Sequence, residues 1–326
     1  MATILSICIP TWNRSKYLRE CLEHAINSVK GYENCVEIIV SNNNSDDNTE
    51  HVVNEFKVSN NFISYNRNTK NTGIDNFYIA ASLARGEYIW IFGDDDKMQK
   101  QAVPTVLDKV AKGYELIIVN YSRWSNDFSK LLQGNGLKFK NDRLFKIKDN
   151  ILSRVGINLG FISSVVIKKS CFFHLSESEY RPHFEYGFPH LFSNYAGLTK
   201  NGGAYLISDQ LVLNRGGNSR EEAEDAPKIF FEGPARIYEL LSTKGYSPKS
   251  IRNAKHLILV HYVFLYILSK KRAGKIPKTL SDILFRHYAS NWFFWVACFP
   301  AMLVPSLILK PIYQLSKLAK KKIGNK

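Results

Sequence analysis

Three consecutive aspartates, at positions 94–96, follow a short apolar run at 88–92 and a single glycine, Gly93. The run is too short for a helix and is rich in aromatic residues and isoleucine, which predicts a buried strand. Ligands of open α/β sheets lie beyond the carboxyl ends of the strands, where these acids would emerge. Because Mg²⁺ is usually held by one or two carboxylates together with substrate phosphates, the pattern indicates a metal seat for a phosphorylated ligand. A solvated turn that caps a helix at 102–112 is the alternative.

The elements that must position these acids alternate between strand and helix patterns. Strands are predicted at 4–10, 36–40, 62–65 and 88–92, and helices at 16–29, 49–56, 74–84 and 102–112. Ser15 is the expected cap of the first helix. The alternation favours parallel βαβ units, which gather the polar loops after the strands at one edge of the sheet. No GxGxxG or GxxxxGKS/T motif follows these strands, which counts against a dinucleotide-binding dehydrogenase and a P-loop NTPase.

The composition is that of a globular chain with a strong positive charge. Of the 326 residues, 45% are hydrophobic, and 44 Lys and Arg oppose 29 Asp and Glu, which gives a net charge of +15. This balance favours an anionic partner: nucleic acid, a phosphorylated substrate or an acidic membrane surface. Five scattered cysteines without a CxxC pair argue against a disulfide framework or a zinc site, so we expect a reducing cytosolic setting. The first ten residues lack the basic leader and long apolar core of a secretion signal.

Four segments, in this order, resemble the signatures of family 2 glycosyltransferases of the GT-A fold. They read SICIPTWNR at 6–14, VSNNNSDDNT at 40–49, NTG at 71–73 and GDDD at 93–96. Three later segments are similar to the bacterial O-antigen branch that includes abequosyltransferases: GFISSVVIKK at 160–169, FPH at 188–190 and LVLNRGGNS at 211–219. The resemblance implies an α/β fold of GT-A type with a mostly parallel sheet. We expect it to form a catalytic domain over 1–225, followed by a helical C-terminal region over 226–326.

The resemblance also implies a donor site for a nucleotide-sugar. The loops after the first two strands would hold the nucleoside, and the acids would hold Mg²⁺ or Mn²⁺ on the diphosphate. A cation there stabilises the negative charge that grows on the departing nucleotide. The metal pair is either Asp94 with Asp96 or Asp95 with Asp96, so all three remain candidates. The donor-binding candidates are Pro10, Thr11, Asn13, Arg14, Asn42, Asn71, Gly73, Asp94 and Arg215.

Asn42 stands where this family commonly has an aspartate that accepts a hydrogen bond from the nucleotide base. An amide donates as well as accepts, so it suits the ring nitrogen of cytosine as readily as the N–H of uracil, which permits a CDP-sugar. An Asx-turn is the alternative. Arg14 and Arg67 are candidates to pair with phosphate, and Arg215 could reach the diphosphate if its glycine-rich loop closes. Ordinary surface arginines and a plain turn would explain the same residues.

A base that deprotonates the acceptor hydroxyl is expected in the stretch 181–190. The family often has a carboxylate at about this point, which favours Glu185, whereas the resemblance to the O-antigen branch runs through His190. Both are therefore candidates for the catalytic base, and a structural histidine is the alternative for His190.

The C-terminal third contains two apolar runs, at 254–269 and 292–309. The first is an expected helix. The second has 18 residues and two prolines, which favours a monotopic or re-entrant segment over a membrane span. Six lysines in the tail 310–326 suit an anionic membrane surface, and a helical hairpin with a solvated tail is the alternative.

These patterns together predict a membrane-associated bacterial glycosyltransferase at the cytoplasmic face of the inner membrane, peripheral or monotopic. It would move a sugar from a nucleotide-sugar donor to a lipid-linked saccharide in O-antigen or surface polysaccharide assembly, with an abequosyltransferase-like enzyme and a CDP-sugar as the first specific hypothesis. Alternatives are a UDP- or dTDP-sugar transferase of another surface glycan, a nucleotidyltransferase and a basic nucleic-acid-binding protein. No nucleic-acid partner is expected, because much of the excess charge lies near an apolar C-terminal run.

Overall fold

The chain folds into two compact units in the computed structural model. The structure describes residues 2–200, 203–217, 225–274 and 276–305. The first unit comprises Met1–Lys146, Phe161–His174 and Gly197–Asn218, and the second comprises Ile147–Gly160, Leu175–Ala196 and Ser219–Lys326. The expected division into a catalytic domain over 1–225 and a helical region over 226–326 stays a prediction. In the structure, two earlier segments also belong to the helical second unit.

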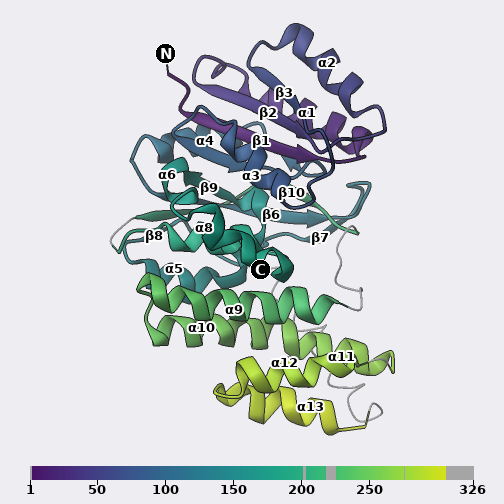
Figure 1. The fold of residues 1–326 in the computed structure, drawn as a ribbon, viewed down its shortest axis with the longest axis vertical. Coiled ribbons are helices and arrows are strands. Elements are labelled where there is room, and N and C mark those ends of the chain that lie inside the picture. Colours follow the sequence, from purple (N-terminus) through teal and green to yellow (C-terminus); the bar gives the residue numbers. More distant parts are fainter. Residues whose placement is uncertain (1, 201–202, 218–224, 275, 306–326) are drawn as a thin grey trace. The chain divides into compact units, whose positions relative to one another are not determined.

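A mixed sheet forms the first unit (Figure 1). Its strands are β1 (Leu5–Thr11), β2 (Val36–Asn42), β3 (Ile63–Arg67), β4 (Tyr88–Ile91), β5 (Lys97–Met98), β6 (Leu116–Trp124), β7 (Leu131–Gln133), β8 (Arg143–Phe145), β9 (Val165–Lys168) and β10 (Ala204–Arg215). The order is β3-β2-β1-β4-β9-β6-β10-β5, with β7 beside β6 and β8 beside β10. Neighbours from β3 to β4 are parallel, as are β6 and β10, whereas β9 runs antiparallel between β4 and β6. The expected mostly parallel α/β sheet is confirmed.

Helices follow the strands of the first unit and make up most of the second. The first unit contains α1 (Ser15–Val29), α2 (Thr49–Ser59), α3 (Asp75–Ser82), α4 (Ala102–Val110) and α6 (Lys169–Phe172). The second contains α5 (Lys148–Val155), α7 (Glu177–Tyr180), α8 (Pro189–Ala196), α9 (Gly233–Leu240), α10 (Pro248–Ile258), α11 (Phe264–Arg272), α12 (Lys278–Tyr288) and α13 (Phe299–Leu303). Each strand and helix expected before residue 113 is present, within a few residues of its expected bounds.

The start of α1 differs from the prediction. Ser15 lies inside the helix, and no side-chain capping bond is formed there. Its backbone N–H instead donates to Asp47 Oδ2 at 2.8 Å, while Asp47 Oδ1 accepts from the N–H of Thr49 at 3.1 Å. One carboxylate from the loop after β2 therefore anchors the starts of two helices, α1 and α2.

The C-terminal apolar runs form helices that contain short π-helical segments, called π-turns below. The run at 254–269 spans α10, a π-turn at Leu259–Val263 and α11. The run at 292–309 begins with a π-turn at Phe294–Cys298 and continues as α13, which has a proline in its first turn. No helix in the described part of the chain is long and apolar enough to cross a membrane. The end of the second run and the lysine-rich tail lie outside the described residues.

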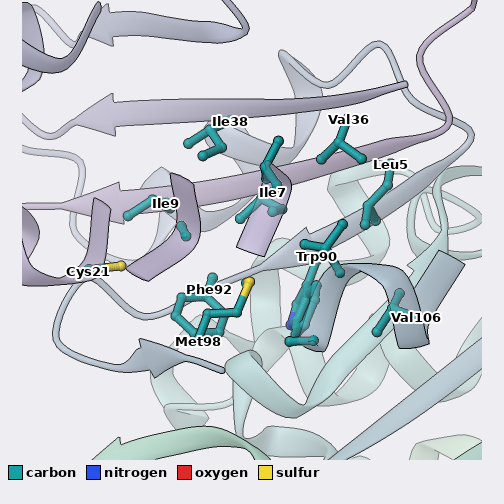
Figure 2. Close-up of a cluster of buried hydrophobic side chains, with 14 of the residues drawn as sticks. Leu5, Ile7, Ile9, Cys21, Val36, Ile38, Trp90, Phe92, Met98 and Val106 are labelled. Carbon is teal, nitrogen blue, oxygen red and sulfur yellow. The ribbon is translucent and has the colours of Figure 1, made fainter. Parts of the chain in front are cut away.

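Alternate residues of the central strands build the core on one face of the sheet (Figure 2). The labelled members of this cluster are Leu5, Ile7, Ile9, Cys21, Val36, Ile38, Trp90, Phe92, Met98 and Val106. Helices α1 and α4 contribute to the same cluster, while α3 contacts β1, β2 and β4. Every residue of β1 and β2 is buried, which is typical of parallel strands that are covered on both faces.

A buried carboxylate ties the amino-terminal ends of the central strands together. Glu37 of β2 accepts at Oε1 from Ser6 Oγ at 2.6 Å and from the N–H of Arg85 at 2.7 Å. Its Oε2 accepts from Arg85 Nε at 2.8 Å. The hydroxyl of Ser6 in turn accepts from the N–H of Gly86 at 2.9 Å. The segment that precedes β4 is thereby held against β1 and β2.

Replacing Glu37 with Gln is expected to lower the free energy of unfolding by about 2–3 kcal/mol, because bonds to a charged acceptor are lost and a new amide donor faces other donors. Urea denaturation followed by circular dichroism measures the change. The matched control is Glu87→Gln, since Glu87 is exposed and pairs with Lys168 at 3.4 Å. We expect less than about 1 kcal/mol for that surface pair. Equal losses in the two variants would contradict the role of Glu37.

Candidate functional site

The three aspartates lie in a tight turn directly after β4. We call residues 93–96 the acid loop. The N–H of Asp96 donates to the carbonyl of Gly93 at 3.2 Å, which closes the turn. A Cβ atom at Gly93 would lie 3.1 Å from Asp96 Oδ2 and 3.3 Å from Asp95 Oδ1. The carboxylates therefore fold back over the glycine, and the missing side chain makes that close approach possible.

Arg14, from the loop after β1, bridges the first two aspartates. Its Nη1 lies 3.1 Å from Asp94 Oδ1 and 3.0 Å from Asp95 Oδ2. The side chain of Arg14 is 39% exposed, whereas that of Asp94 is 8% exposed. The structure thus brings a predicted phosphate-binding residue to the predicted metal seat. The guanidinium partly neutralises two adjacent carboxylates.

Asp96 is held from the other side of the turn. Its Oδ2 accepts from Ser163 Oγ at 2.6 Å, and its Oδ1 accepts from Asn214 Nδ2 and from the N–H of Arg215, both at 3.0 Å. Ser163 precedes β9, while Asn214 and Arg215 end β10. Segments far apart in the sequence therefore meet at this one carboxylate.

The surroundings of the acid loop disfavour negative charge. Burial raises the pKa of Asp94 to about 6, against the effects of Arg14 and the hydroxyl of Thr11. Burial also raises the pKa of Asp96, and the neighbouring charge of Asp95 adds to this. Since buried like charges that lie close together raise one another's pKa, a cation brought to the loop would be bound favourably.

A divalent cation fits this loop when phosphate supplies further ligands. Among the described residues, no three His, Cys, Asp or Glu side chains are grouped so as to hold a metal ion by themselves. Mg²⁺ commonly takes only one or two carboxylates and completes its shell with phosphate and water. Asp94 and Asp96 are buried oxygen ligands with raised pKa values, and a bound cation would stabilise their ionised forms. The fit is to a cation that arrives with a phosphorylated ligand.

The loops after β1 and β2 are tied to each other. Pro10 and Thr11 end β1 and are buried. Asn13 has a left-handed backbone, with φ of 52°, and its N–H donates to Ser45 Oγ at 2.9 Å. Its side-chain Oδ1 accepts from the N–H of Asp46 at 2.8 Å. Asn13 therefore joins the two loops that were predicted to hold the nucleoside.

Asn42 is fully buried at the end of β2. Its Oδ1 accepts from the N–H of Ser45 at 2.8 Å, and its Nδ2 donates to the hydroxyl of Tyr65 at 2.8 Å. The bond to Ser45 reaches a backbone N–H three residues on, one residue beyond the Asx-turn that the sequence left open as an alternative. A contact between Asn42 and a nucleotide base stays a prediction; the two bonds use one of the two N–H groups of Nδ2 and one of the two lone pairs of Oδ1.

Asn43 organises the loop that follows β3. Its Nδ2 donates to Asn71 Oδ1 at 2.8 Å and to the carbonyl of Gly73 at 3.2 Å. Its Oδ1 accepts from the N–H of Thr72 at 2.9 Å. Gly73 has φ of 59°, a left-handed value at which a side chain would be strained. The predicted donor residues Asn71 and Gly73 are thereby fixed beside the end of β2.

The remaining predicted arginines are engaged by the protein itself. Arg67 pairs with Glu50 at 2.8 Å and donates to the carbonyl of Ser45 at 3.0 Å. Arg215 is buried, and its Nε donates to the carbonyl of Asp95 at 2.9 Å while its Nη2 pairs with Glu20 at 2.8 Å.

Two aromatic rings cover the guanidinium of Arg215, with centroids 4.6 Å away for Tyr17 and 4.4 Å away for Phe128. In the structure the buried Arg215 supports the acid loop through its hydrogen bond to the carbonyl of Asp95. A direct contact between Arg215 and a diphosphate stays a prediction.

The two candidate bases belong to the second unit and differ in exposure. Glu185 is exposed in a 3₁₀ segment at Arg181–Tyr186. His190 is buried in α8, where its Nε2 lies 2.8 Å from the carbonyl oxygen of Gly160. Burial lowers the pKa of His190 to about 4, so the ring is neutral at pH 7. These features are typical of a structural histidine, and both base assignments stay predictions.

Sequence reasoning missed Ser163, Asn214 and Asn43 as residues that shape the site. Ser163 and Asn214 lie in segments whose resemblance to a family was noted, yet nothing local assigns them chemistry. Ser163 is 67 positions from Asp96 and Asn214 is 118 positions from it. Only the order of strands in the sheet brings them together.

Comparison with known proteins identifies the family. A sequence model of glycosyl transferase family 2 matches residues 6–168, which is half of the chain. The chain belongs to this family. The match runs from β1 to the end of β9 and includes the acid loop and Ser163. Membership makes the protein a glycosyltransferase and sets aside the nucleotidyltransferase and nucleic-acid-binding alternatives.

Curated relatives of this glycosyltransferase include an abequosyltransferase and a glucosyltransferase, both bacterial. The abequosyltransferase RfbV of Salmonella typhimurium is 29% identical over 279 residues, which cover 81% of this chain and 82% of that protein. The GalNAc(5)-diNAcBac-PP-undecaprenol beta-1,3-glucosyltransferase of Campylobacter jejuni is 32% identical over 154 residues, which cover 46% of this chain and 48% of that protein. The resemblance to the O-antigen branch is confirmed.

Solved structures with the same fold include S. aureus TarS and a mannosyltransferase. S. aureus TarS 1-349 in complex with UDP-GlcNAc has a TM-score of 0.55 at 12% identity and covers 90% of this chain and 76% of that one. The mannosyltransferase PcManGT from Pyrobaculum calidifontis, in complex with GDP-Man and Mn²⁺, has a TM-score of 0.54 at 12% identity and covers 96% of this chain and 88% of that one. At such identity the likeness shows the fold alone, which is the GT-A type expected from the sequence.

Proposed function

We propose that this family 2 glycosyltransferase moves a sugar from a nucleotide-sugar to a lipid-linked saccharide during assembly of a bacterial surface polysaccharide such as O-antigen. One observation carries the proposal: Arg14 and three aspartates meet at the carboxyl ends of β1 and β4. The names of the Salmonella and Campylobacter relatives support the choice of glycan and of a lipid-linked acceptor.

The acid loop would bind the donor's diphosphate through Mg²⁺ or Mn²⁺. Asp94 and Asp96 would hold the cation, which supplies positive charge where the departing nucleotide gains negative charge. Arg14 would turn from the carboxylates to a phosphate oxygen once the cation neutralises them. The buried position of Asp94 strengthens each of these interactions, because water screens them less.

The nucleotide base would lie beside the loops after β1 and β2. A CDP-sugar is the first candidate, since the amide of Asn42 can donate to the ring nitrogen of cytosine. A UDP- or dTDP-sugar is the alternative. Asn13, Asn71 and Gly73 would fix the walls of this site through the loop contacts that they already make.

A nucleotide screen tests the donor site. We expect one of CDP, UDP, GDP and dTDP to raise the melting temperature by about 5 °C at about 100 times its Kd with Mn²⁺ present, and by less without it. Asp94→Asn should abolish the metal-dependent part, because a neutral amide binds a hard cation poorly. The matched control is Asp108→Asn, an exposed helical aspartate of the same unit, which should behave as wild type. The absence of any nucleotide-dependent shift in the wild type would refute the proposed site.

Glu185 is our proposed base for the acceptor hydroxyl, because it is exposed whereas His190 is enclosed. Glu185→Gln is expected to lower kcat by about 10²- to 10⁴-fold, the usual contribution of a general base. His190→Gln should leave kcat within about threefold, because the carbonyl of Gly160 already engages the buried ring.

Steady-state kinetics with saturating donor measures this contrast, and Glu177→Gln is the control. Glu177 is exposed in the same unit and pairs with Arg181 within one helical turn. A His190→Gln protein that melts normally but loses turnover would reverse the assignment.

The second unit would attach to the anionic inner surface of the cytoplasmic membrane. Exposed apolar side chains concentrate between positions 285 and 303: Phe285, Trp292, Trp295, Val296 and Leu303. Basic residues Lys270, Lys271 and Arg272 end α11 in the same unit. Apolar and cationic groups near each other are typical of surfaces that insert into anionic membranes, where each Lys or Arg contributes about 1 kcal/mol. A peripheral or monotopic attachment would bring the enzyme to a lipid-linked acceptor.

Removing two of these apolar groups tests the attachment. A variant with Val296→Ser and Leu303→Ser should bind vesicles of phosphatidylglycerol and phosphatidylcholine about tenfold more weakly, because less apolar surface enters the bilayer. Val296 and Leu303 are 63% and 67% exposed, so the fold should tolerate both changes. Val58→Ser is the control, since Val58 is 87% exposed on α2 of the first unit. Co-sedimentation that is equal for all three proteins would contradict the proposed surface.

A further inference from the structure

Ser163 links the two ends of the acid loop. Its hydroxyl oxygen accepts from the N–H of Gly93 at 2.9 Å and donates its proton to Asp96 Oδ2 at 2.6 Å. Its own carbonyl accepts from Trp90 Nε1 at 2.9 Å. Ser163 and Trp90 have no exposed surface, and Asp96 is 2% exposed. The hydroxyl is therefore held between the backbone N–H of Gly93 and the carboxylate of Asp96, at the two ends of the acid loop.

The bonds at Asp96 limit how that carboxylate can meet a ligand. A carboxylate offers about four acceptor positions, two on each oxygen. Asn214 Nδ2 and the N–H of Arg215 take those of Oδ1, and Ser163 takes one of Oδ2. With these donors in place, Asp96 presents a single oxygen position to a cation, on Oδ2. The hydroxyl of Ser163 sets the orientation of that oxygen.

The turn itself also depends on this hydroxyl. The N–H of Gly93, which is partly buried, would lose its acceptor without Ser163, and an unpaired donor shielded from water is costly. The oxygens of the loop lie close to Gly93, since a Cβ there would be 3.1 Å from Asp96 Oδ2 and 3.3 Å from Ser163 Oγ. A small displacement of Asp96 would therefore change the whole turn.

We propose that Ser163 is a positioning residue of the donor site, which fixes Asp96 Oδ2 and the acid-loop turn in the orientation that binds the metal ion with the nucleotide. This inference rests on the proposed function, and it extends that function to a residue outside the acidic motif. Ser163 would touch neither nucleotide nor sugar. Its effect would pass through Asp96 alone.

The neighbouring Ser164 provides a matched control. Both serines are fully buried in the same 3₁₀ turn at Ile162–Ser164. The hydroxyl of Ser164 has no hydrogen-bond partner among the described residues. Ser163→Ala and Ser164→Ala thus remove the same atom from adjacent buried positions, and only the first breaks a link to the acid loop.

The experiment measures Mn²⁺ binding by electron paramagnetic resonance of the free ion, with CDP and with UDP present at saturation. We expect Ser163→Ala to weaken Mn²⁺ binding about tenfold, the equivalent of one lost hydrogen bond to a charged group. Ser164→Ala should bind Mn²⁺ as the wild type does. Nucleotide affinity without metal should be unchanged in both variants, a selectivity that a merely structural role would not produce.

Three results would overturn the inference. They are unchanged Mn²⁺ affinity in Ser163→Ala, equal weakening in both variants, or an equal loss of nucleotide affinity without metal. If Ser163→Ala does not fold, Ser163→Cys replaces the hydroxyl by a weak donor and should give an intermediate Mn²⁺ affinity, and wild-type affinity in that variant would refute the role. A wild-type protein that binds no Mn²⁺ with CDP, UDP, GDP or dTDP would instead refute the proposed metal site itself.

Discussion

Placing three adjacent carboxylates in one mostly buried turn is the constraint on which the rest of this site depends. Burial raises the pKa of Asp94 and of Asp96, and the neighbouring charge of Asp95 adds to both shifts. The turn persists because opposing groups converge on it: Arg14 on Asp94 and Asp95, and three hydrogen-bond donors on Asp96. Strands β1, β9 and β10 must therefore end or begin near the end of β4. The topology of the sheet meets this requirement.

Buried carboxylates lie at both ends of the sheet, and their surroundings differ. At the amino-terminal end, Glu37 receives its donors from Ser6 and from Arg85. This arrangement joins β1 and β2 to the segment that precedes β4, and each oxygen of the carboxylate accepts a hydrogen bond. At the carboxyl end, Asp94 keeps a raised pKa despite its contact with Arg14. The first end contributes stability, whereas the second retains a preference for additional positive charge, which is what a ligand-binding site requires.

Amide side chains shape the loops around the acids together with the charged side chains of Arg14 and Asp47. Asn43 joins the end of β2 to the loop at Thr72 and Gly73, and Asn13 joins the loop after β1 to Ser45. An amide both donates and accepts, so these contacts hold the loops without adding net charge beside the carboxylates.

The sequence by itself determined the order of strands and helices up to residue 112, the α/β class and the position of the acids after a buried strand. It could do so because hydrophobic periodicity and turn residues are local signals, which depend only on residues close together in the sequence. Local signals also gave the wrong cap for α1, since the true partner of Ser15 is Asp47 from another loop. Only the tertiary structure decided that Ser163 and Asn214 meet Asp96, that Arg215 is buried beneath Tyr17 and Phe128, and that His190 is enclosed while Glu185 is exposed. Those facts depend on which strands pair and which segments pack together, and contacts between residues 67 or 118 positions apart leave no periodic trace in the sequence.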